Sequence, residues 1–394
     1  MISAAQVAAA RATTPGWGEQ VLLNHAGASP MSDAALAALQ AHLALESRLG
    51  PMDAADVVAP HLQRVRDDAA RLLNASADEV AFMGSGSAAF GAVWSAFTHT
   101  APLRAGDRIL VGRQEWGGTL ATYRRAAERV GATVEVLPCK PDGRVDAEAS
   151  AALLDDRVRW LSLTWLPANG GLIHDAAALR RLARAAGVPY FIDAGQAVGQ
   201  LPVDVRALGC DVLKSAGRKH LRGPRGTALL YVRRGFLDRL DPPWVDVQSA
   251  PWEQGMREDA RRFETSEQPV ALRLALGVAI AEALDVGIDA IAHRVQALAQ
   301  SLREQLAALP HVRVHDVSEG PRSGLVSFTV DGESAPDTRA RLATQGIRVG
   351  ANGVPYTPLD MQARGLTGIV RASLSWLNDA GDIARLVAAL ESAP

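Results

Sequence analysis

Apolar positions in the first two thirds of the chain alternate between short continuous runs and the repeat of an amphipathic helix. The short runs predict strands at residues 79–83, 108–111, 133–137, 160–164, 190–193 and 211–215. The helical repeats between them predict helices after Ser32 and at residues 57–73, 87–97, 119–130 and 175–186. Strands that alternate with helices of this length predict an α/β fold with a mainly parallel, doubly wound sheet.

The pattern changes after about residue 240. Residues 241–252 are rich in proline and tryptophan, which predicts a loop. Long helical repeats follow at residues 270–285 and 290–309, then strands at 312–315, 325–330 and 369–375, with helices at 337–345 and at the C-terminus. We therefore expect a large domain at residues 16–265 and a smaller α+β domain at residues 266–394 that includes residues 1–15.

The composition excludes several classes of protein. The 394 residues are 48% hydrophobic, and 41 basic residues balance 43 acidic ones without a charged block, so we expect no nucleic-acid or membrane partner. No apolar run approaches the roughly 20 residues of a membrane span, and residues 1–14 do not resemble a signal peptide. Two cysteines, Cys139 and Cys210, are too few for a disulfide framework. We expect a soluble cytoplasmic protein.

Lysine is scarce, because only Lys140, Lys214 and Lys219 occur among the 41 basic residues. Arginine can supply positive charge elsewhere, but it stays protonated and cannot form a Schiff base, whereas a lysine amine can. The three lysines are therefore the positions at which to look for a reactive amine.

A turn of small residues lies between a predicted strand and a predicted helix, at residues 84–87 (Gly-Ser-Gly-Ser). Small residues allow a phosphate to approach the backbone, and the start of a helix offers free N–H groups. A dinucleotide-binding fingerprint would need a third glycine where Ala89 or Phe90 stands, so this turn fits a phosphate or an ordinary tight turn.

Two further segments lie where parallel sheets bind ligands, at the carboxyl ends of strands. Asp193 ends a buried strand, and it could be a helix cap; no other ligands stand at metal-like spacing, so we expect no metal. Lys214 and Ser215 end the next strand and point to opposite faces, so at most one of them can face a site. Lys219 follows in a basic loop, a kind of segment that is usually solvated surface.

In combination these motifs resemble the fold-type I pyridoxal 5′-phosphate (PLP) enzymes, specifically the class V aminotransferase and cysteine desulfurase family. The resemblance extends from residues 23–27 to residues 371–373, with the motifs in the family's order and spacing. It implies PLP as the cofactor and a large domain with a doubly wound sheet beside a smaller C-terminal domain. Residues 261–268 resemble the segment that crosses a dimer interface in this family, which implies a homodimer with a shared active site.

The resemblance also implies the roles of single residues. Lys219 would carry the cofactor as an aldimine, and Asp193 would pair with the ring nitrogen; these two are the expected catalytic residues. A buried carboxylate favours the protonated ring, which is the form that acts as an electron sink. The other implied cofactor-binding residues are Gly86, Ser87, Ser215 and Arg218 at the phosphate, Gln196 at the ring hydroxyl and Trp116 on the ring face.

Substrate binding is assigned in the same way to Gly27 and to Arg371, whose guanidinium would hold the substrate carboxylate. We expect neither Lys140 nor Lys214 to be placed where it could replace Lys219.

The sequence departs from the desulfurases of the family. They carry a catalytic cysteine in a loop of the small domain, whereas the corresponding residues 348–359 contain none. An asparagine of the desulfurases is replaced by Ala168, and the histidine before their Schiff-base lysine is replaced by Arg218. The Arg-Lys pair is more similar to the branch with the ergothioneine-pathway C–S lyase and the isopenicillin epimerase relatives.

We therefore expect β-elimination at the C–S bond of an S-substituted cysteine, through a quinonoid that starts from the Lys219 aldimine. Transamination, epimerisation and decarboxylating deamination remain alternatives, because these reactions share the early steps. A non-catalytic binding protein of this fold would be expected to lose Lys219 or Asp193, and both are present. A nicotinamide oxidoreductase is the remaining alternative.

Overall fold

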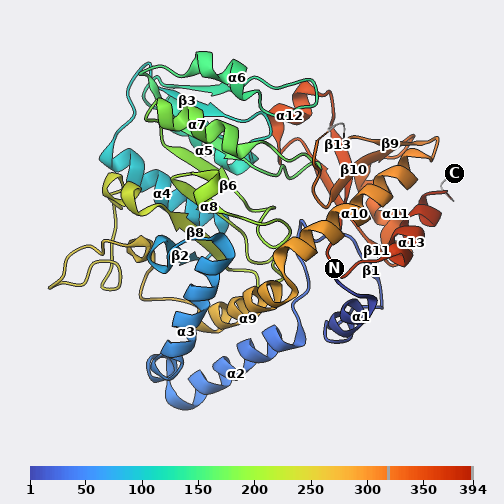
Figure 1. The fold of residues 1–394 in the computed structure, drawn as a ribbon, viewed down its shortest axis with the longest axis horizontal. Helices are drawn as coiled ribbons and strands as arrows, with labels where there is room; N and C mark the ends of the chain where they lie inside the picture. Colours follow the sequence, from blue (N-terminus) through green and yellow to red (C-terminus); the bar gives the residue numbers. More distant parts are fainter. Residues whose placement is uncertain (317–319, 392–394) are drawn as a thin grey trace.

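The computed structural model describes residues 1–316 and 320–391. Its centre is a seven-stranded sheet in the order β2-β8-β7-β6-β5-β3-β4 (Figure 1). The strands are β2 (Val80–Met83), β3 (Arg108–Val111), β4 (Thr133–Val136), β5 (Val158–Thr164), β6 (Tyr190–Asp193), β7 (Val212–Lys214) and β8 (Ala228–Val232). Only β8 runs antiparallel to its neighbours within this sheet. The predicted mainly parallel α/β sheet is confirmed.

Helices cover both faces of this sheet, because consecutive strand residues point to opposite sides. Ile192 packs into a cluster on one face that includes residues of α3 (Pro51–Leu73), α7 (Ala176–Ala185) and α9 (Val270–Val286). Phe191 packs into a cluster on the other face. That second cluster includes residues of α4 (Gly86–Thr100) and α5 (Gly117–Glu128). The doubly wound arrangement therefore follows from the central strands, in which consecutive residues are apolar and bury side chains on both faces of the sheet.

A second, antiparallel sheet lies in the C-terminal part of the chain, in the order β12-β13-β10-β9. Its strands are β9 (Val312–Val314), β10 (Leu325–Val330), β12 (Gly350–Gly353) and β13 (Gly368–Ser373). The helices of this part are α10 (Ile288–Ala307), α11 (Ala335–Thr344), α12 (Pro358–Ala363) and α13 (Ala380–Glu391). No helix among the described residues is both long and apolar enough to cross a membrane.

The N-terminal segment lies against this C-terminal part. β1 (Val21–Leu22) pairs in parallel with β11 (Ile347–Arg348), and Arg11 of α1 (Ala4–Ala12) donates to the carbonyl of Leu377 at 2.7 Å. Residues 21–22, which sequence analysis assigned to the large domain, thus pair with a strand of the smaller one. The domain boundaries themselves stay a prediction. The remaining helices are α2 (Asp33–Leu49), α6 (Ala147–Ser150) and α8 (Val205–Leu208).

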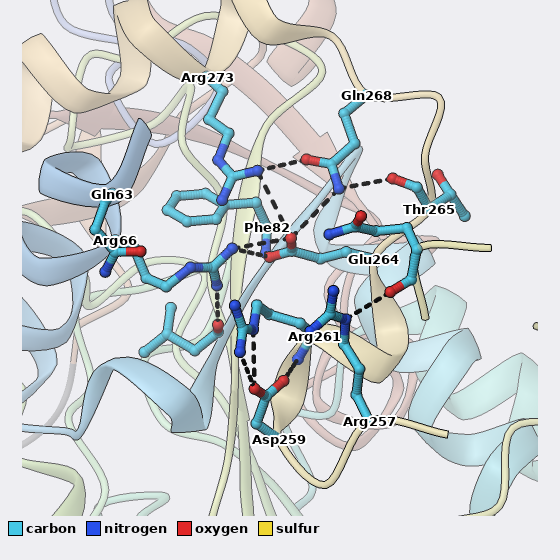
Figure 2. Close-up of polar contacts among 12 residues, drawn as sticks. Gln63, Arg66, Phe82, Arg257, Asp259, Arg261, Glu264, Thr265, Gln268 and Arg273 are labelled. Atoms are coloured by element: carbon cyan, nitrogen blue, oxygen red, sulfur yellow. Dashed lines mark hydrogen bonds and ion pairs between the residues drawn. The ribbon is translucent and has the colours of Figure 1, made fainter. Parts of the chain in front are cut away.

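The end of β2, which leads into the small-residue turn, is anchored by the buried carboxylate of Glu264 (Figure 2). Arg66 donates to both Glu264 oxygens, at 2.8 and 2.9 Å, and the Phe82 N–H donates to Oε1 at 2.9 Å. Arg273 lies 3.6 Å from Oε2 and stacks over the Phe82 ring. Glu264 therefore joins β2, α3 and α9 at one point.

The same segment was expected to reach a partner subunit. In the single chain, Glu264 and Arg262 both turn inward, and the Arg262 guanidinium donates to the carbonyls of Leu237 and Leu240. Ser266 and Glu267 are exposed. Arg261, Thr265 and Gln268 of the same segment are partly exposed.

Replacing Glu264 with glutamine should lower the free energy of unfolding by about 3 kcal/mol, because it removes the negative charge that faces the buried Arg66 and the partly buried Arg273. Glu267→Gln is the matched control, and its exposed side chain should change stability by less than about 0.5 kcal/mol. Urea denaturation followed by circular dichroism measures both values. Equal midpoints for the two variants would contradict the anchoring role.

Candidate active site

One cavity of about 650 Å³ lies at the carboxyl ends of the parallel strands, between the large sheet and strands β12 and β13. All but one of the residues assigned from the sequence line it: Gly27, Gly86, Ser87, Trp116, Asp193, Gln196, Arg218, Lys219 and Arg371. The exception is Ser215. Another cavity, of about 710 Å³, lies at the opposite ends of the strands and contains none of these residues.

Asp193 is at the centre of a row of side chains on one face of the sheet. It is the last residue of β6, and its register partners are Thr164 on β5 and Lys214 on β7. Partners in register point to the same face. Lys214 Nζ accordingly lies 2.6 Å from Asp193 Oδ2, and the N–H of Gly195 donates to Oδ1 at 2.9 Å. Both oxygens of this buried carboxylate are thus fixed.

A second carboxylate, Glu115, lies beside this row and positions Trp116. Glu115 Oε1 accepts from the Thr164 hydroxyl at 2.9 Å and from the Trp116 N–H at 3.1 Å, and Oε2 accepts from the Ser162 hydroxyl at 2.7 Å. Burial raises the pKa of Glu115 to about 7, and the charge of Asp193 adds to the effect. Glu115 thereby fixes the backbone from which the Trp116 side chain enters the cavity.

Lys219 lies in the loop after β7, with its amine near Asp193 and Gly195. Burial lowers the pKa of this amine from 10.5 to about 7; Asp193 opposes the change, while the charges of Lys214 and nearby arginines increase it. Near neutral pH a substantial fraction of Lys219 is therefore uncharged. An uncharged amine can act as a nucleophile or as a base.

The start of α4 forms another wall of the cavity. The Ser85 hydroxyl caps the helix by accepting from the Ala88 N–H at 3.0 Å, and the exposed Ser87 follows. A Cβ on Gly86 would lie 2.7 Å from the Ser215 carbonyl oxygen. Only glycine therefore allows the helix N-terminus to approach β7 this closely, which brings free N–H groups to the cavity.

The expectation that the Ser215 side chain faces the cavity is wrong. Its hydroxyl accepts from the Leu229 N–H on β8 at 3.0 Å, and its side chain is fully buried outside the cavity lining. Strand alternation turns Lys214 toward the cavity instead. Both lysines line the same cavity. The expectation that Lys214 could not replace Lys219 stays a prediction.

Arg371, on β13, is a buried cation without an anionic partner among the described residues. Its guanidinium donates to the Ala168 carbonyl at 2.7 Å and to Asn24 Oδ1 at 3.2 Å, and its Nε has no partner. Burial lowers the pKa of Arg371 to about 10. A buried guanidinium in such neutral surroundings is suited to an incoming carboxylate.

The remaining assigned residues border the same space. Gln196 donates to the Ala26 carbonyl at 3.2 Å, and its buried Oε1 has no partner. The Arg218 guanidinium donates to the Gly27 carbonyl. The Trp116 ring lies 5.5 Å from that of Tyr356, measured between centroids.

The charge of the lining fits an anionic cofactor and substrate. Its six cationic side chains belong to Lys214, Arg218, Lys219, Arg225, Arg339 and Arg371, and its only acidic one belongs to Asp193. PLP brings a phosphate, and an amino acid brings a carboxylate. The unpartnered polar atoms of Gln196 and Arg371 offer further contacts. The residues present therefore fit PLP.

Sequence analysis assigned no role to several lining residues, notably Lys214, Thr164 and Asn24, whereas Tyr356 belongs to the loop that was expected to accommodate a bulky S-substituent. For Lys214 a signal existed in the scarcity of lysine. Thr164 ends a predicted strand, as Asp193 does, and could have been found by its position. Asn24 and Tyr356 reach the cavity through tertiary packing alone.

Comparisons with known proteins agree with this geometry. The family model described as Aminotransferase class-V matches residues 21–386. Cysteine desulfurases of Salmonella agona and Salmonella typhimurium are 32% identical over 345 residues, which cover 84% of this chain and 81% of each relative.

Solved structures share the fold over nearly the whole chain. A cysteine desulfurase of Thermococcus onnurineus has a TM-score of 0.88 at 22% identity and covers 98% of this chain and 97% of its own. A cystine C–S lyase in complex with its reaction product cysteine persulfide has a TM-score of 0.86 at 23% identity, with 96% and 99% covered. The architecture is that of fold-type I PLP-dependent enzymes.

Gly86→Ala should lower the free energy of unfolding by about 1–3 kcal/mol, because the added methyl group would collide with the Ser215 carbonyl. Gly84→Ala, two residues earlier, adds the same group where nothing lies within 4 Å, and it should change stability by less than about 0.5 kcal/mol. Urea unfolding of both variants gives the comparison. A Gly86 variant as stable as the wild type would contradict the close approach of α4 and β7.

Proposed function

Given that the chain belongs to the class V aminotransferase family and is a PLP-dependent enzyme, we propose that it cleaves the C–S bond of an S-substituted cysteine by β-elimination. In this proposal the sulfur leaves with its substituent and does not pass to a protein thiol. The similarity to proteins named cysteine desulfurase and cystine C–S lyase supports a cysteine-derived substrate.

The positions of the two cysteines are the observation that favours β-elimination over sulfur transfer to a protein thiol. Cys210 is fully buried just before β7, at the opposite end of the strands from the candidate active site, and Cys139 is half-buried after β4. Neither lines the cavity. Burial raises the pKa of both thiols, which disfavours the nucleophilic thiolate. A persulfide-forming thiol is therefore missing from the cavity.

The loop that would carry such a thiol instead presents other side chains. Asn352 and Tyr356 line the cavity from β12 and the turn after it, and the Asn352 amide donates to Asn169 Oδ1 at 2.8 Å. Residues 348–359 contain no cysteine. Elimination needs no second catalytic thiol, so this loop is compatible with a lyase.

Each residue then has a task in the proposed reaction. Bound PLP supplies an electron sink for the negative charge that develops at the substrate α-carbon. Lys219 would hold the cofactor, and its amine would take up the proton of the substrate α-carbon and return a proton to the leaving sulfur. Asp193 keeps the proton on the ring nitrogen. Arg371 binds the substrate carboxylate and so orients the α-carbon toward Lys219.

The phosphate contacts belong to the same proposal. The N-terminus of α4, with Gly86 and Ser87, and the Arg218 guanidinium would hold the cofactor phosphate. Trp116 would cover one face of the ring, and Gln196 would contact the ring hydroxyl. Gly27 would border the substrate.

We also propose that the enzyme is a cytoplasmic homodimer. Exposed apolar side chains on two adjacent helices support an interface, since Leu43, Leu49, Met52 and Val57 are 46–80% exposed. The loop at residues 244–252 adds the exposed side chains of Trp244 and Trp252. Ser266 and Glu267 are exposed in the segment that was expected to cross the interface.

Borohydride reduction of the holoenzyme should fix the cofactor on Lys219, because its amine lies in the cavity beside Asp193 and burial lowers its pKa to about 7. Peptide mapping by mass spectrometry identifies the modified residue. Lys219→Ala should stay folded, lose turnover and give no adduct. Since Lys214 lies in the same cavity, an adduct on Lys214 would overturn the assignment of Lys219.

The double variant Cys139→Ala, Cys210→Ala should retain most of its turnover with S-substituted cysteines, measured as pyruvate and ammonia, because no protein thiol takes part. It should lose about 1 kcal/mol of stability for each buried thiol. A folded, yellow but inactive double variant would show that a thiol is required. Exchange between amino-acid and keto-acid pairs without pyruvate release would favour an aminotransferase instead.

A further inference from the structure

Lys214 has no role in the function proposed above, yet it occupies the candidate active site. Only 7% of the residue is exposed, and Asp193, its partner, is 6% exposed. Their charged atoms are 2.6 Å apart, because the two residues are register partners at the ends of β6 and β7. Burial of two charges is costly unless they are paired in good geometry.

The surroundings of the pair explain why its charge matters. On one side lies the buried Glu115, which accepts hydrogen bonds from Ser162 and Thr164. On the other side lies the Lys219 amine, which is affected by the charges of Asp193, Lys214, Arg218 and Arg371. Asp193 is thus the shared neighbour of both lysines.

We propose that Lys214 is a positioning residue, whose ammonium fixes the Asp193 carboxylate for the cofactor ring nitrogen and places a positive charge near Lys219. The proposal rests on the proposed function, since it assumes the roles given there to Asp193 and Lys219. The Gly195 N–H holds Oδ1 and Lys214 holds Oδ2, so the carboxylate cannot rotate before the cofactor arrives.

The positive charge has a defined consequence for Lys219. A neighbouring cation disfavours a second positive charge, so it lowers the proton affinity of the Lys219 nitrogen, both as a free amine and as a Schiff base. Loss of Lys214 would remove this effect and would also leave the negative charge of Asp193 uncompensated. Both changes raise the proton affinity of the Lys219 nitrogen. The Schiff-base nitrogen should then hold its proton to higher pH.

The first test compares Lys214→Met with Lys140→Met, which removes the same charge from an exposed position. The visible band of bound PLP is followed during a pH titration of each holoenzyme. The midpoint should rise by roughly one pH unit in Lys214→Met and stay at the wild-type value in Lys140→Met. A folded Lys214→Met holoenzyme with an unchanged midpoint would overturn the proposal.

The second test needs no cofactor and serves if Lys214→Met does not fold. Urea unfolding of the apoprotein is compared for Asp193→Asn, Lys214→Met and the double variant. Each single change leaves one buried charge unpaired, so the double variant should be more stable than the sum of the single losses predicts. Additive losses would show that the pair is not coupled and would overturn the proposal.

The two tests separate this proposal from the proposed function. If borohydride fixes the cofactor on Lys219 but the titration midpoint does not move, the role of Lys214 fails while the function stands. If the double-mutant cycle of the apoprotein shows coupling but no S-substituted cysteine is cleaved, the pairing of Lys214 with Asp193 is supported and the proposed β-elimination is wrong. An adduct on Lys214 would overturn both.

Discussion

The buried carboxylate of Asp193 is the interaction on which the candidate active site depends. It ends the central strand β6, and register pairing brings Thr164 and Lys214 beside it from the two neighbouring strands. Through Thr164 it is connected to Glu115 and so to the backbone of Trp116. Lys214 and Lys219 both lie in its field. The negative charge of Asp193, at the carboxyl end of the central strand β6, therefore determines how the surrounding side chains are arranged.

The rest of the cavity lining is basic. The lining carries six basic side chains and, besides Asp193, no acidic one. Arg371 reaches this space from the C-terminal sheet and is held by neutral oxygens of Ala168 and Asn24. The cavity thus offers positive charge from both parts of the chain, which suits a cofactor with a phosphate at one end and a substrate with a carboxylate at the other.

The same framework limits the chemistry. The Glu264 network fixes the end of β2, the strand that precedes α4 (Figure 2). Both thiols lie outside the cavity lining, Cys210 fully buried and Cys139 half-buried. A member of the class V family that lacks a thiol at this position has to release sulfur with its substituent or leave the C–S bond intact. Asn352 and Tyr356 line the cavity from the loop at residues 348–359.

Much of this architecture was predictable from the sequence. Hydrophobic runs and helical repeats predicted the parallel sheet, although β8 was missed. The short β1, β11 and β12 were also missed, because brief runs carry little periodic signal. Asp193 and Lys219 were found because their residue types and order along the chain point to one chemistry. The absence of a cysteine in residues 348–359 could also be read directly from the sequence.

Tertiary structure decided the remaining points. Alternation along a strand predicts that Lys214 and Ser215 point to opposite faces of the sheet. Which face carries the site depends on the register of the sheet. The register pairs Lys214 with Asp193, so Lys214 enters the cavity and Ser215 does not. Register and the packing of helices on the sheet arise from contacts between residues far apart in the sequence. Local spacing contains no information about those contacts, and this is why the Asp193–Lys214 pair could be seen only in the folded chain.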